Sequence, residues 1–233
     1  MSAISYRHDR QGDGVAVIAM DDGKVNVLSP AMIGEINGAL DRAESEEAKA
    51  VVIAGNDRVF SGGFDLKVFR SGDAQASIDM LKAGFSLSHR LLSFPKPVVA
   101  ACTGHAIAMG SFLACSVDHR IAAPGYNFQA NEVAIGMVLP YPALEILKLR
   151  LTRAAFQQAV GLARVFFGES AVAGGWVDEI VLPEIVLTRA EESAREFATL
   201  SAGAHHASKL RARKEALDAM QIGIDNMHQE LGL

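Results

Sequence analysis

Two short glycine-bearing segments constrain the fold more than any other feature of this sequence: FSGGFD, from Phe60 to Asp65, and GHAIAMGS, from Gly104 to Ser111. Each follows an apolar run typical of a buried strand, and each precedes a stretch with helical character. A strand, a tight glycine turn and a helix start leave backbone N–H groups free and aimed outward. The repeat of this arrangement predicts two such donors at one point, where they could hold a developing oxyanion. Taken singly, each segment also fits an ordinary strand-to-helix turn.

The apolar pattern predicts strands that alternate with helices through about the first two-thirds of the chain, followed by helices, which indicates an α/β fold. The predicted strands are 14–20, 50–54, 98–102 and 119–123. The predicted helices are one that begins after Ser29 and Pro30, and then 78–92, 109–117, 144–151, 154–162, 190–199 and 208–230. A boundary near residue 170 is weakly marked, and 70–77 has the composition of a mobile segment.

The amino-acid composition limits the kinds of binding partner and the cellular compartment that we expect for this protein. Half of the 233 residues are apolar, and the net charge is −5, which argues against nucleic acid as the main partner. Cys102 and Cys115 lie in apolar runs and are expected to be reduced and buried. The N-terminus has no apolar signal core, and no run of about eighteen apolar residues occurs, so we expect no membrane span and a cytoplasmic protein.

The run FQANEVAIGMVLP, residues 128–140, places Glu132 among apolar neighbours. Apolar surroundings disfavour the charged carboxylate and raise its pKa. A glutamate with a raised pKa is suited to act as a general base or acid near neutral pH. The alternatives at this point are a solvated loop glutamate or a helix cap.

These segments together resemble the crotonase (enoyl-CoA hydratase/isomerase) superfamily. FSGGFDLK resembles its FSAGADLK-type turn, and KPVVAACTGHAIAMGSFLACSVDHRIAA resembles its second oxyanion segment and the following strand. FQANEVAIG resembles the segment that bears its second catalytic glutamate, and GGWVDEIV, at 174–181, resembles its GLVDEVV element. The resemblance implies a spiral of ββα units over 1–170 and a helical trimerisation region over 171–233. It further implies a homotrimer or hexamer.

The resemblance also implies the site. The backbone N–H groups of Phe64 and Met109 would bind the thioester oxygen of an acyl-CoA, and Glu132 would exchange protons with the substrate. Coenzyme A would be part of the substrate, so no separate cofactor and no metal are expected. The early loop with Lys24 and Val25 would lie near the adenine part of CoA. The remaining implied substrate-binding residues are Gly62, Gly63, Asp65, Leu66, Gly110 and Phe112.

The sequence departs from the family pattern at three positions. Met109 replaces the usual glycine, and Phe64 is bulkier than the usual alanine. Phe112 stands where hydratases carry a second glutamate, three residues after the second donor and hence on the same helix face. A phenylalanine cannot activate water, whereas moving a double bond from C3 to C2 needs only one base. The chain therefore resembles 3,2-trans-enoyl-CoA isomerases.

Two other functions stay open at this point. One is an enoyl-CoA hydratase that works through Glu132 with water held in some other way. The other is a non-catalytic CoA- or RNA-binding module on the same fold, although the acidic balance counts against RNA. Pocket depth depends on how 70–82 and 137–146 fold. The basic residues of the last helix belong either to a solvated face or to a contact with CoA phosphates; they are Lys209, Arg211, Arg213 and Lys214.

Overall fold

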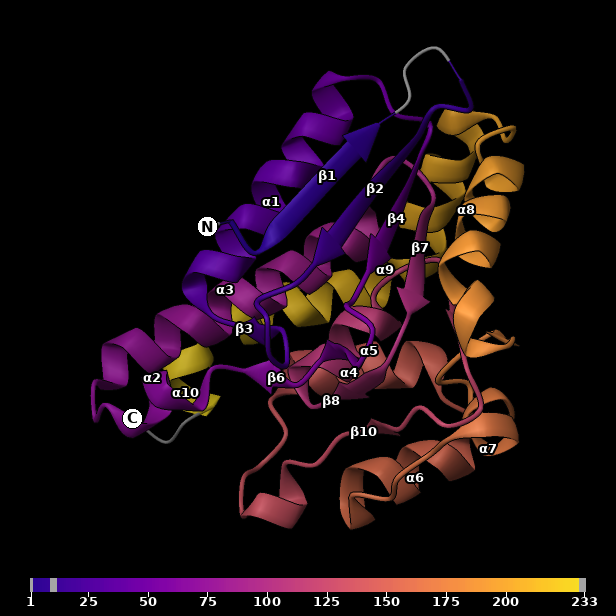
Figure 1. Ribbon diagram of the computed structural model, residues 1–233. Coiled ribbons are helices and arrows are strands. Elements are labelled where there is room, and N and C mark those ends of the chain that lie inside the picture. Colours follow the sequence, from indigo (N-terminus) through magenta and orange to yellow (C-terminus); the bar gives the residue numbers. More distant parts are fainter. Residues whose placement is uncertain (1, 9–11, 231–233) are drawn as a thin grey trace.

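A six-stranded sheet forms the centre of the fold in the computed structural model, which describes residues 2–8 and 12–230 (Figure 1). β1 (Ile4–His8) runs antiparallel to β2 (Val15–Met20), and the other neighbouring strands of this sheet are parallel. In spatial order the strands are β1 (Ile4–His8), β2 (Val15–Met20), β4 (Ala50–Ala54), β7 (Val98–Cys102), β9 (His119–Ala122) and β11 (Glu179–Ile180).

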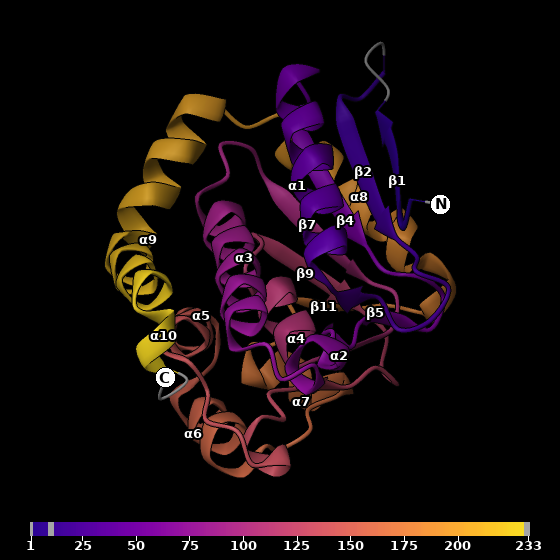
Figure 2. The ribbon, with the colours of Figure 1, turned by 90° about the vertical axis from the view of Figure 1, so that its left-hand side faces the viewer.

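Helices cover both faces of this sheet. On β4, Val51 and Ile53 belong to the core cluster shared with α1 (Pro30–Ser45) and α3 (Ala74–Ser93). Their neighbour Val52 belongs to the second cluster, with α8 (Val186–Phe197). Figure 2 shows α1 and α3 on one side of the sheet and α8 on the other. A strand that is buried on both faces consists almost entirely of apolar residues, so the central strands could be predicted from the sequence.

The chain visits a second, smaller sheet after each of three central strands. β4 leads to β5 (Val59–Ser61), β6 (Gly63–Phe64), α2 (Leu66–Arg70) and α3. β7 leads to β8 (His105–Ile107) and α4 (Met109–Cys115), and β9 leads to β10 (Phe128–Gln129). The small sheet has the order β10-β8-β5, and β3 (Val27–Leu28) pairs with β6. The expected spiral of ββα units is confirmed.

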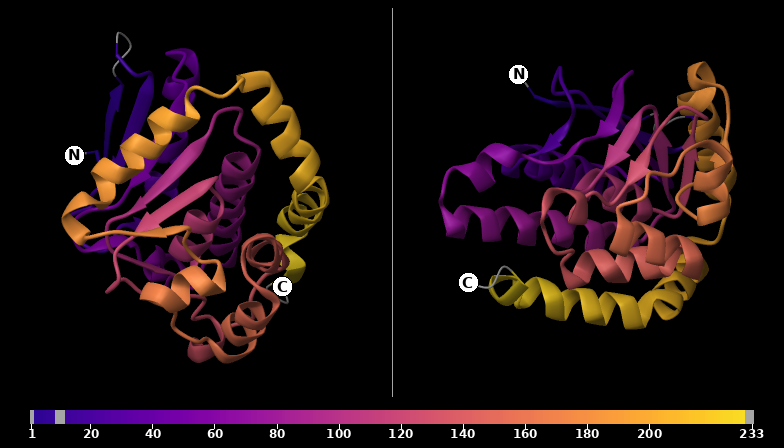
Figure 3. Two further views of the ribbon diagram at one scale, coloured as in Figure 1. Left: turned by 90° about the vertical axis from the view of Figure 1, so that its right-hand side faces the viewer. Right: turned by 90° about the horizontal axis from the view of Figure 1, so that it is seen from below.

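The remainder of the described chain is mainly helical. α9 (Ala202–Asp225) packs against α3 and α5 (Tyr141–Arg150), as Figure 2 and the right-hand view of Figure 3, seen from below, show. None of the helices within residues 2–8 and 12–230 combines the length and the hydropathy that a membrane-spanning helix requires. The elements of this part are the short 3-10 helix η1 (Val133–Ile135), α5 (Tyr141–Arg150), α6 (Arg153–Leu162), α7 (Gly168–Gly174), η2 (Pro183–Ile185), α9 (Ala202–Asp225) and α10 (Met227–Glu230).

The structure contains helical residues and short strands that the sequence does not predict, and each has a local physical reason. The side chain of Asp73 accepts a hydrogen bond from the backbone N–H of Ala76 at 2.9 Å, so α3 starts at Ala74 and includes half of the 70–77 segment. The strands β5, β6, β8 and β10 have only two or three residues each, too few to show a period of their own. Cys102 and Cys115 are buried free thiols, as predicted.

Candidate active site

The two glycine turns meet in the structure. A Cβ built on Gly63 would lie 3.3 Å from the backbone nitrogen of Met109 and 3.0 Å from the carbonyl oxygen of Ile107. A Cβ built on Gly110 would lie 2.2 Å from the carbonyl oxygen of Ser61. Each turn therefore uses a glycine to let the other approach, and Gly63 has in addition a φ of 93°. The two turns therefore lie directly against each other.

The second turn carries a strained residue directly before its helix. Ala108 has φ 50° and ψ −127°, a conformation that residues with a Cβ rarely adopt. Met109 follows as the first residue of α4, so its backbone N–H has no acceptor within the helix and lies at the positive end of the helix dipole. Strain of this kind is commonly kept where a backbone group must point in a particular direction.

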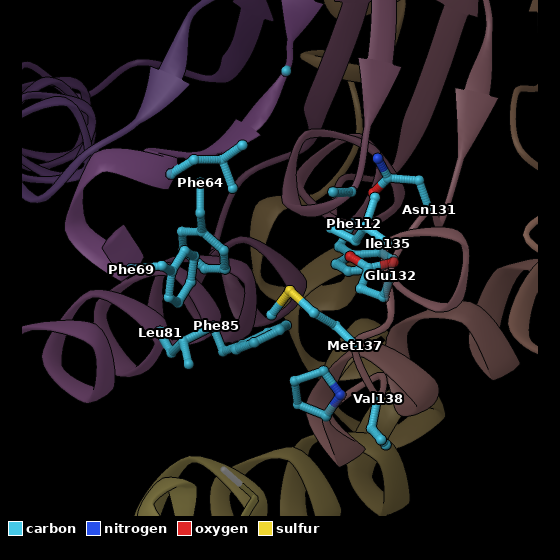
Figure 4. Close-up of a pocket in the computed structure, with 14 residues that line it drawn as sticks. Phe64, Phe69, Leu81, Phe85, Phe112, Asn131, Glu132, Ile135, Met137 and Val138 are labelled. Carbon is cyan, nitrogen blue, oxygen red and sulfur yellow. The ribbon is translucent and has the colours of Figure 1, made fainter. Parts of the chain in front are cut away.

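A pocket of about 160 Å³ opens beside the two turns (Figure 4). Its wall comes from the first turn, α2, α3, the start of α4 and the segment 131–140, and it is almost entirely apolar. The lining includes residues from both stretches on which pocket depth was expected to depend, 70–82 and 137–146. The lining residues are Gly62, Phe64, Leu66, Phe69, Leu81, Phe85, Ala108, Phe112, Asn131, Glu132, Ile135, Met137, Val138 and Pro140.

Glu132 supplies the carboxylate of this pocket. It is 8% exposed and lies just before η1, and its Oε2 atom is buried without a hydrogen-bond partner among the described residues. Burial raises the pKa of Glu132 to about 7, and a hydrogen bond with its own backbone acts in the other direction. A carboxylate with this pKa can take up and release a proton near neutral pH. The alternative of a solvated loop glutamate is wrong, since the side chain is buried. The alternative of a helix cap is met in position only: Glu132 is the N-cap residue of η1, but its side chain makes no cap hydrogen bond.

A chain of contacting aromatic rings forms a large part of the pocket wall. Phe112 is 1% exposed and stacks on Phe85, with ring centroids 6.4 Å apart. Phe85 contacts Phe64 edge-on at 6.1 Å, and Phe64 contacts Phe69 at 6.2 Å. Figure 4 shows Phe64 and Phe69 across the pocket from Glu132 and Phe112. Phe112 thus occupies the pocket where the hydratase pattern has a second glutamate.

The other predicted binding residues surround the pocket without all lining it. Gly62 and Leu66 line it, whereas Gly63, Met109 and Gly110 contribute backbone behind the lining. Asp65 caps α2, since its Oδ1 accepts from the backbone N–H of Lys67 at 3.0 Å.

The early loop reaches the first glycine turn through its backbone. The carbonyl oxygen of Val25 accepts a hydrogen bond from the backbone N–H of Gly62 at 2.8 Å. Lys24 and Val25 are exposed and lie outside the lining of the pocket. Asn26 is fully buried and its Nδ2 donates to the carbonyl oxygens of Met20, Val59 and Phe60 at 3.0–3.3 Å, so the loop is anchored to two strands.

The expectation of a solvated basic face on the last helix is wrong for two of its residues. Lys209 is 6% exposed and its Nζ donates to Asp118 at 2.7 Å, while Arg213 donates to the other oxygen of Asp118 at 2.8 Å. Burial lowers the pKa of Lys209 to about 8, although Asp118 opposes the shift. Arg211 and Lys214 are exposed, as expected for residues on a solvated helix face. Helical periodicity could not identify the inward pair, because both its members are charged.

Three residues at the site were not identified from the sequence. Asn131 lines the pocket next to Glu132, and only its place directly before the glutamate could have signalled it. Phe85 and Gly84 belong to α3, which the sequence predicts as a helix without indicating which face meets the pocket. Within the described part of the chain, no cluster of three or more His, Cys, Asp or Glu residues could hold a metal ion.

The chain is similar to known proteins over nearly its whole length. The enoyl-CoA hydratase/isomerase family model matches residues 10–230. A solved enoyl-CoA hydratase from Mycobacterium ulcerans is 64% identical with a TM-score of 0.96, covering 98% of this chain and 99% of that one. A Mycobacterium tuberculosis protein described as an enoyl-CoA isomerase is 60% identical with a TM-score of 0.95, covering 98% of this chain and 99% of that one. The human mitochondrial delta3-delta2-enoyl-CoA isomerase is 25% identical with a TM-score of 0.89, covering 99% and 95%.

Proposed function

The chain belongs to the enoyl-CoA hydratase/isomerase family of the crotonase superfamily, and we propose that it is an enoyl-CoA isomerase, which moves a double bond from C3 to C2 of an acyl-CoA thioester. The observation that carries the proposal is the pairing of one buried carboxylate, Glu132, with an apolar residue, Phe112, in the same pocket. The names of similar proteins include both hydratases and isomerases, so the choice between the two reactions rests on the residues of the pocket.

The proposed oxyanion site consists of the backbone N–H groups of Phe64 and Met109. It would receive the thioester oxygen, where negative charge develops when the substrate loses a proton from C2. Support comes from the approach of the two turns and from the position of Met109 at the start of α4. Preorganised backbone donors in a dry site stabilise such charge far better than water does.

Glu132 would act as the single base. Its carboxylate takes the proton from C2, the electron pair delocalises into the adjacent thioester carbonyl and, through the C3–C4 double bond, to C4, and the resulting dienolate takes the proton back at C4. The C3–C4 double bond is thereby replaced by a C2–C3 double bond, and no atom is gained or lost. A pKa of about 7 allows the group both to accept and to return the proton at neutral pH.

Phe112 supports isomerisation over hydration. A hydratase of the two-glutamate type activates water with a carboxylate at this position, and a benzyl group offers neither charge nor hydrogen bond. The stack of Phe112 on Phe85 closes this wall against water, which limits hydration of the product. A hydratase is the second candidate, and the names of similar proteins favour it.

The remaining parts of the proposal concern binding and assembly. Gly62, Gly63, Asp65, Leu66 and Gly110 would shape the turns around the thioester, and Lys24 and Val25 would lie along CoA. Coenzyme A would enter as part of the substrate, with no separate cofactor. Residues 171–233 would mediate assembly into a homotrimer or hexamer, and the cytoplasm is the expected compartment.

The test is a comparison of two substrates. The protein is incubated with a series of trans-3-enoyl-CoA thioesters, and formation of the conjugated thioester is followed; hydration of the matching 2-enoyl-CoA is measured in parallel. Isomerisation is expected to be the faster reaction and to require Glu132, with Glu132→Gln as control. Turnover of 2-enoyl-CoA alone would make the protein a hydratase instead.

A further inference from the structure

Two apolar cavities share the segment that follows Glu132 as a common wall. The first is the pocket of about 160 Å³ described above, and the second is a groove of about 380 Å³. All the residues that line the groove are glycine, aliphatic or methionine, and they come from 133–139, α5 (Leu144) and α6 (Val160). Met137 and Val138 line both cavities, so these two residues stand between the pocket and the groove. The isomerisation described above makes no use of the groove.

The pocket alone has room for a short acyl chain. A dry protein cavity of about 150 Å³ with aliphatic and aromatic walls holds a benzene molecule, that is, about six carbon atoms. A pocket of about 160 Å³ is therefore filled by an acyl group of about six carbons. A longer chain has to leave the pocket through one of its walls.

The walls of the pocket differ in how firmly they are packed. Phe85 and Phe112 are each 1% exposed and belong to the main core, where a ring cannot move without displacing its neighbours. Val138, in contrast, is 83% exposed, and Met137 is half-buried. Leu66 is also exposed, but it closely follows the first glycine turn and so lies where the thioester, rather than the end of the chain, is expected. The wall at Met137 is therefore the one that can open for the chain.

Met137 combines a fixed backbone with a flexible side chain. Its backbone N–H donates to the carbonyl oxygen of Glu132 at 2.8 Å, and the backbone N–H of Gly136 donates to that of Val133 at 3.2 Å. Figure 4 shows the Met137 side chain reaching from the wall of Glu132 toward Phe85. An unbranched thioether side chain adapts its conformation easily. When it turns aside, the pocket and the groove are joined while the backbone that carries Glu132 stays in place.

We propose that an acyl chain longer than about six carbons passes Met137 and lies in the groove, so that the substrates include medium- and long-chain acyl-CoA thioesters and Met137 sets the preference for chain length. Each methylene group that moves from water to apolar surroundings contributes about fourfold in affinity. The groove thus makes affinity rise with chain length beyond the capacity of the pocket. This inference rests on the proposed function only in that the pocket receives an acyl-CoA thioester, and it holds for either reaction.

The experiment compares two saturated thioesters that bind without a double bond to move, hexanoyl-CoA and decanoyl-CoA. Their dissociation constants for the full-length protein are measured by isothermal titration calorimetry. Decanoyl-CoA is expected to bind the wild-type protein at least about tenfold more tightly than hexanoyl-CoA. This is less than full burial of the added methylenes would give, because the exposed Val138 leaves the groove open on one side.

Three variants test the path of the chain. Val160→Asp places a charge in the groove and should lower the ratio of the two affinities about tenfold. Leu162→Asp makes the same change two residues later on α6, at a position that is 74% exposed and lines neither cavity, and should leave the ratio unchanged. Met137→Ala should raise the ratio about threefold, because the longer chain no longer has to displace a side chain.

Equal affinity of the two thioesters for the wild-type protein would overturn the proposal. An unchanged ratio in Val160→Asp, or the same fall in Leu162→Asp, would do so as well, and a ratio that does not rise in Met137→Ala would reject the role of Met137. If Val160→Asp failed to fold, the wild-type comparison and Met137→Ala would still decide. Because these affinities are measured without turnover, they do not depend on the proposed isomerase, which is tested separately by its reaction with 3-enoyl-CoA.

Discussion

The ring of Phe64 occupies the space where a side chain on Gly84 would lie. A Cβ built on Gly84 would come within 2.4 Å of Cε1 and 2.6 Å of Cζ of that ring. Because Gly84 has no side chain, α3 leaves room for the ring of Phe64 at a position where the family usually has alanine. Phe64 then packs edge-on against Phe85 and becomes part of the pocket wall.

Gly84→Ala should therefore damage the pocket. The new methyl group pushes the Phe64 ring into the cavity or off its contact with Phe85, at a cost of about 1–3 kcal/mol in the free energy of unfolding. We also expect a clear loss of kcat/KM for 3-enoyl-CoA. Gly38→Ala in α1, where a Cβ meets nothing within 4 Å, should be neutral or up to about 1 kcal/mol stabilising. Thermal unfolding distinguishes the two variants; a Gly84→Ala protein with wild-type stability and activity would contradict the packing argument.

Glu132→Gln should abolish most turnover. Loss of a general base commonly lowers kcat by about 10²–10⁴-fold, and here no other carboxylate lines the described pocket. In the wild-type protein kcat/KM for isomerisation should fall below about pH 7, where Glu132 becomes protonated, by about tenfold per pH unit. A pH–rate profile measures this limb. A flat profile down to pH 5 would mean that Glu132 is not the base.

The same residue should make stability depend on pH. The folded pKa of Glu132 is about 7, above the value of about 4.3 in an unfolded chain, so between these values the folded state keeps a proton that the unfolded state releases. Stability is therefore highest below the unfolded pKa and is lost as the pH rises through about 7. Glu132→Gln should be more stable than wild type at pH 8, by about 3–4 kcal/mol, and equal to it near pH 4. Glu215→Gln, an exposed substitution on α9, is the matched control.

Asp118→Asn should destabilise the protein strongly. It removes the counter-charge of Lys209 and Arg213, which both donate to Asp118 and attach α9 to the sheet layer. Leaving buried cations without their partner costs about 3–5 kcal/mol. Lys214→Ala, which breaks an exposed ion pair on the same helix, should cost less than about 1 kcal/mol. Denaturant unfolding of the two variants checks the difference, and equal midpoints would show that the buried cluster contributes no more than a surface pair.

Phe112→Glu should raise hydration of crotonyl-CoA relative to isomerisation. The new carboxylate would face the same pocket as Glu132 and restore the two-glutamate pattern, at a cost in stability because the position is 1% exposed. Phe112→Leu keeps an apolar side chain and should show no such gain. A folded Phe112→Glu protein without increased hydration would remove the main reason for preferring an isomerase over a hydratase.

Much of the fold and part of the site could be predicted from the sequence. The buried strands 50–54 and 98–102 are continuous apolar runs, and the helix after Ser29 begins with a serine cap and a proline, so each follows from its own residues. The short strands of the second sheet could not be found in this way. Strands such as β6 and β10 exist because neighbouring backbone pairs with them, and two residues carry no pattern.

The local elements of this site can be predicted from neighbouring residues: two glycine turns between strands and helices, a glutamate in an apolar segment, and a phenylalanine where hydratases of the family carry a second carboxylate. Three other properties depend on long-range packing: Gly84 makes room for Phe64, burial raises the pKa of Glu132 to about 7, and Asp118 pairs with Lys209, 91 residues away. The physical reason is that turn geometry depends on adjacent residues, whereas burial, space and electrostatic environment are sums over segments that are far apart in the chain.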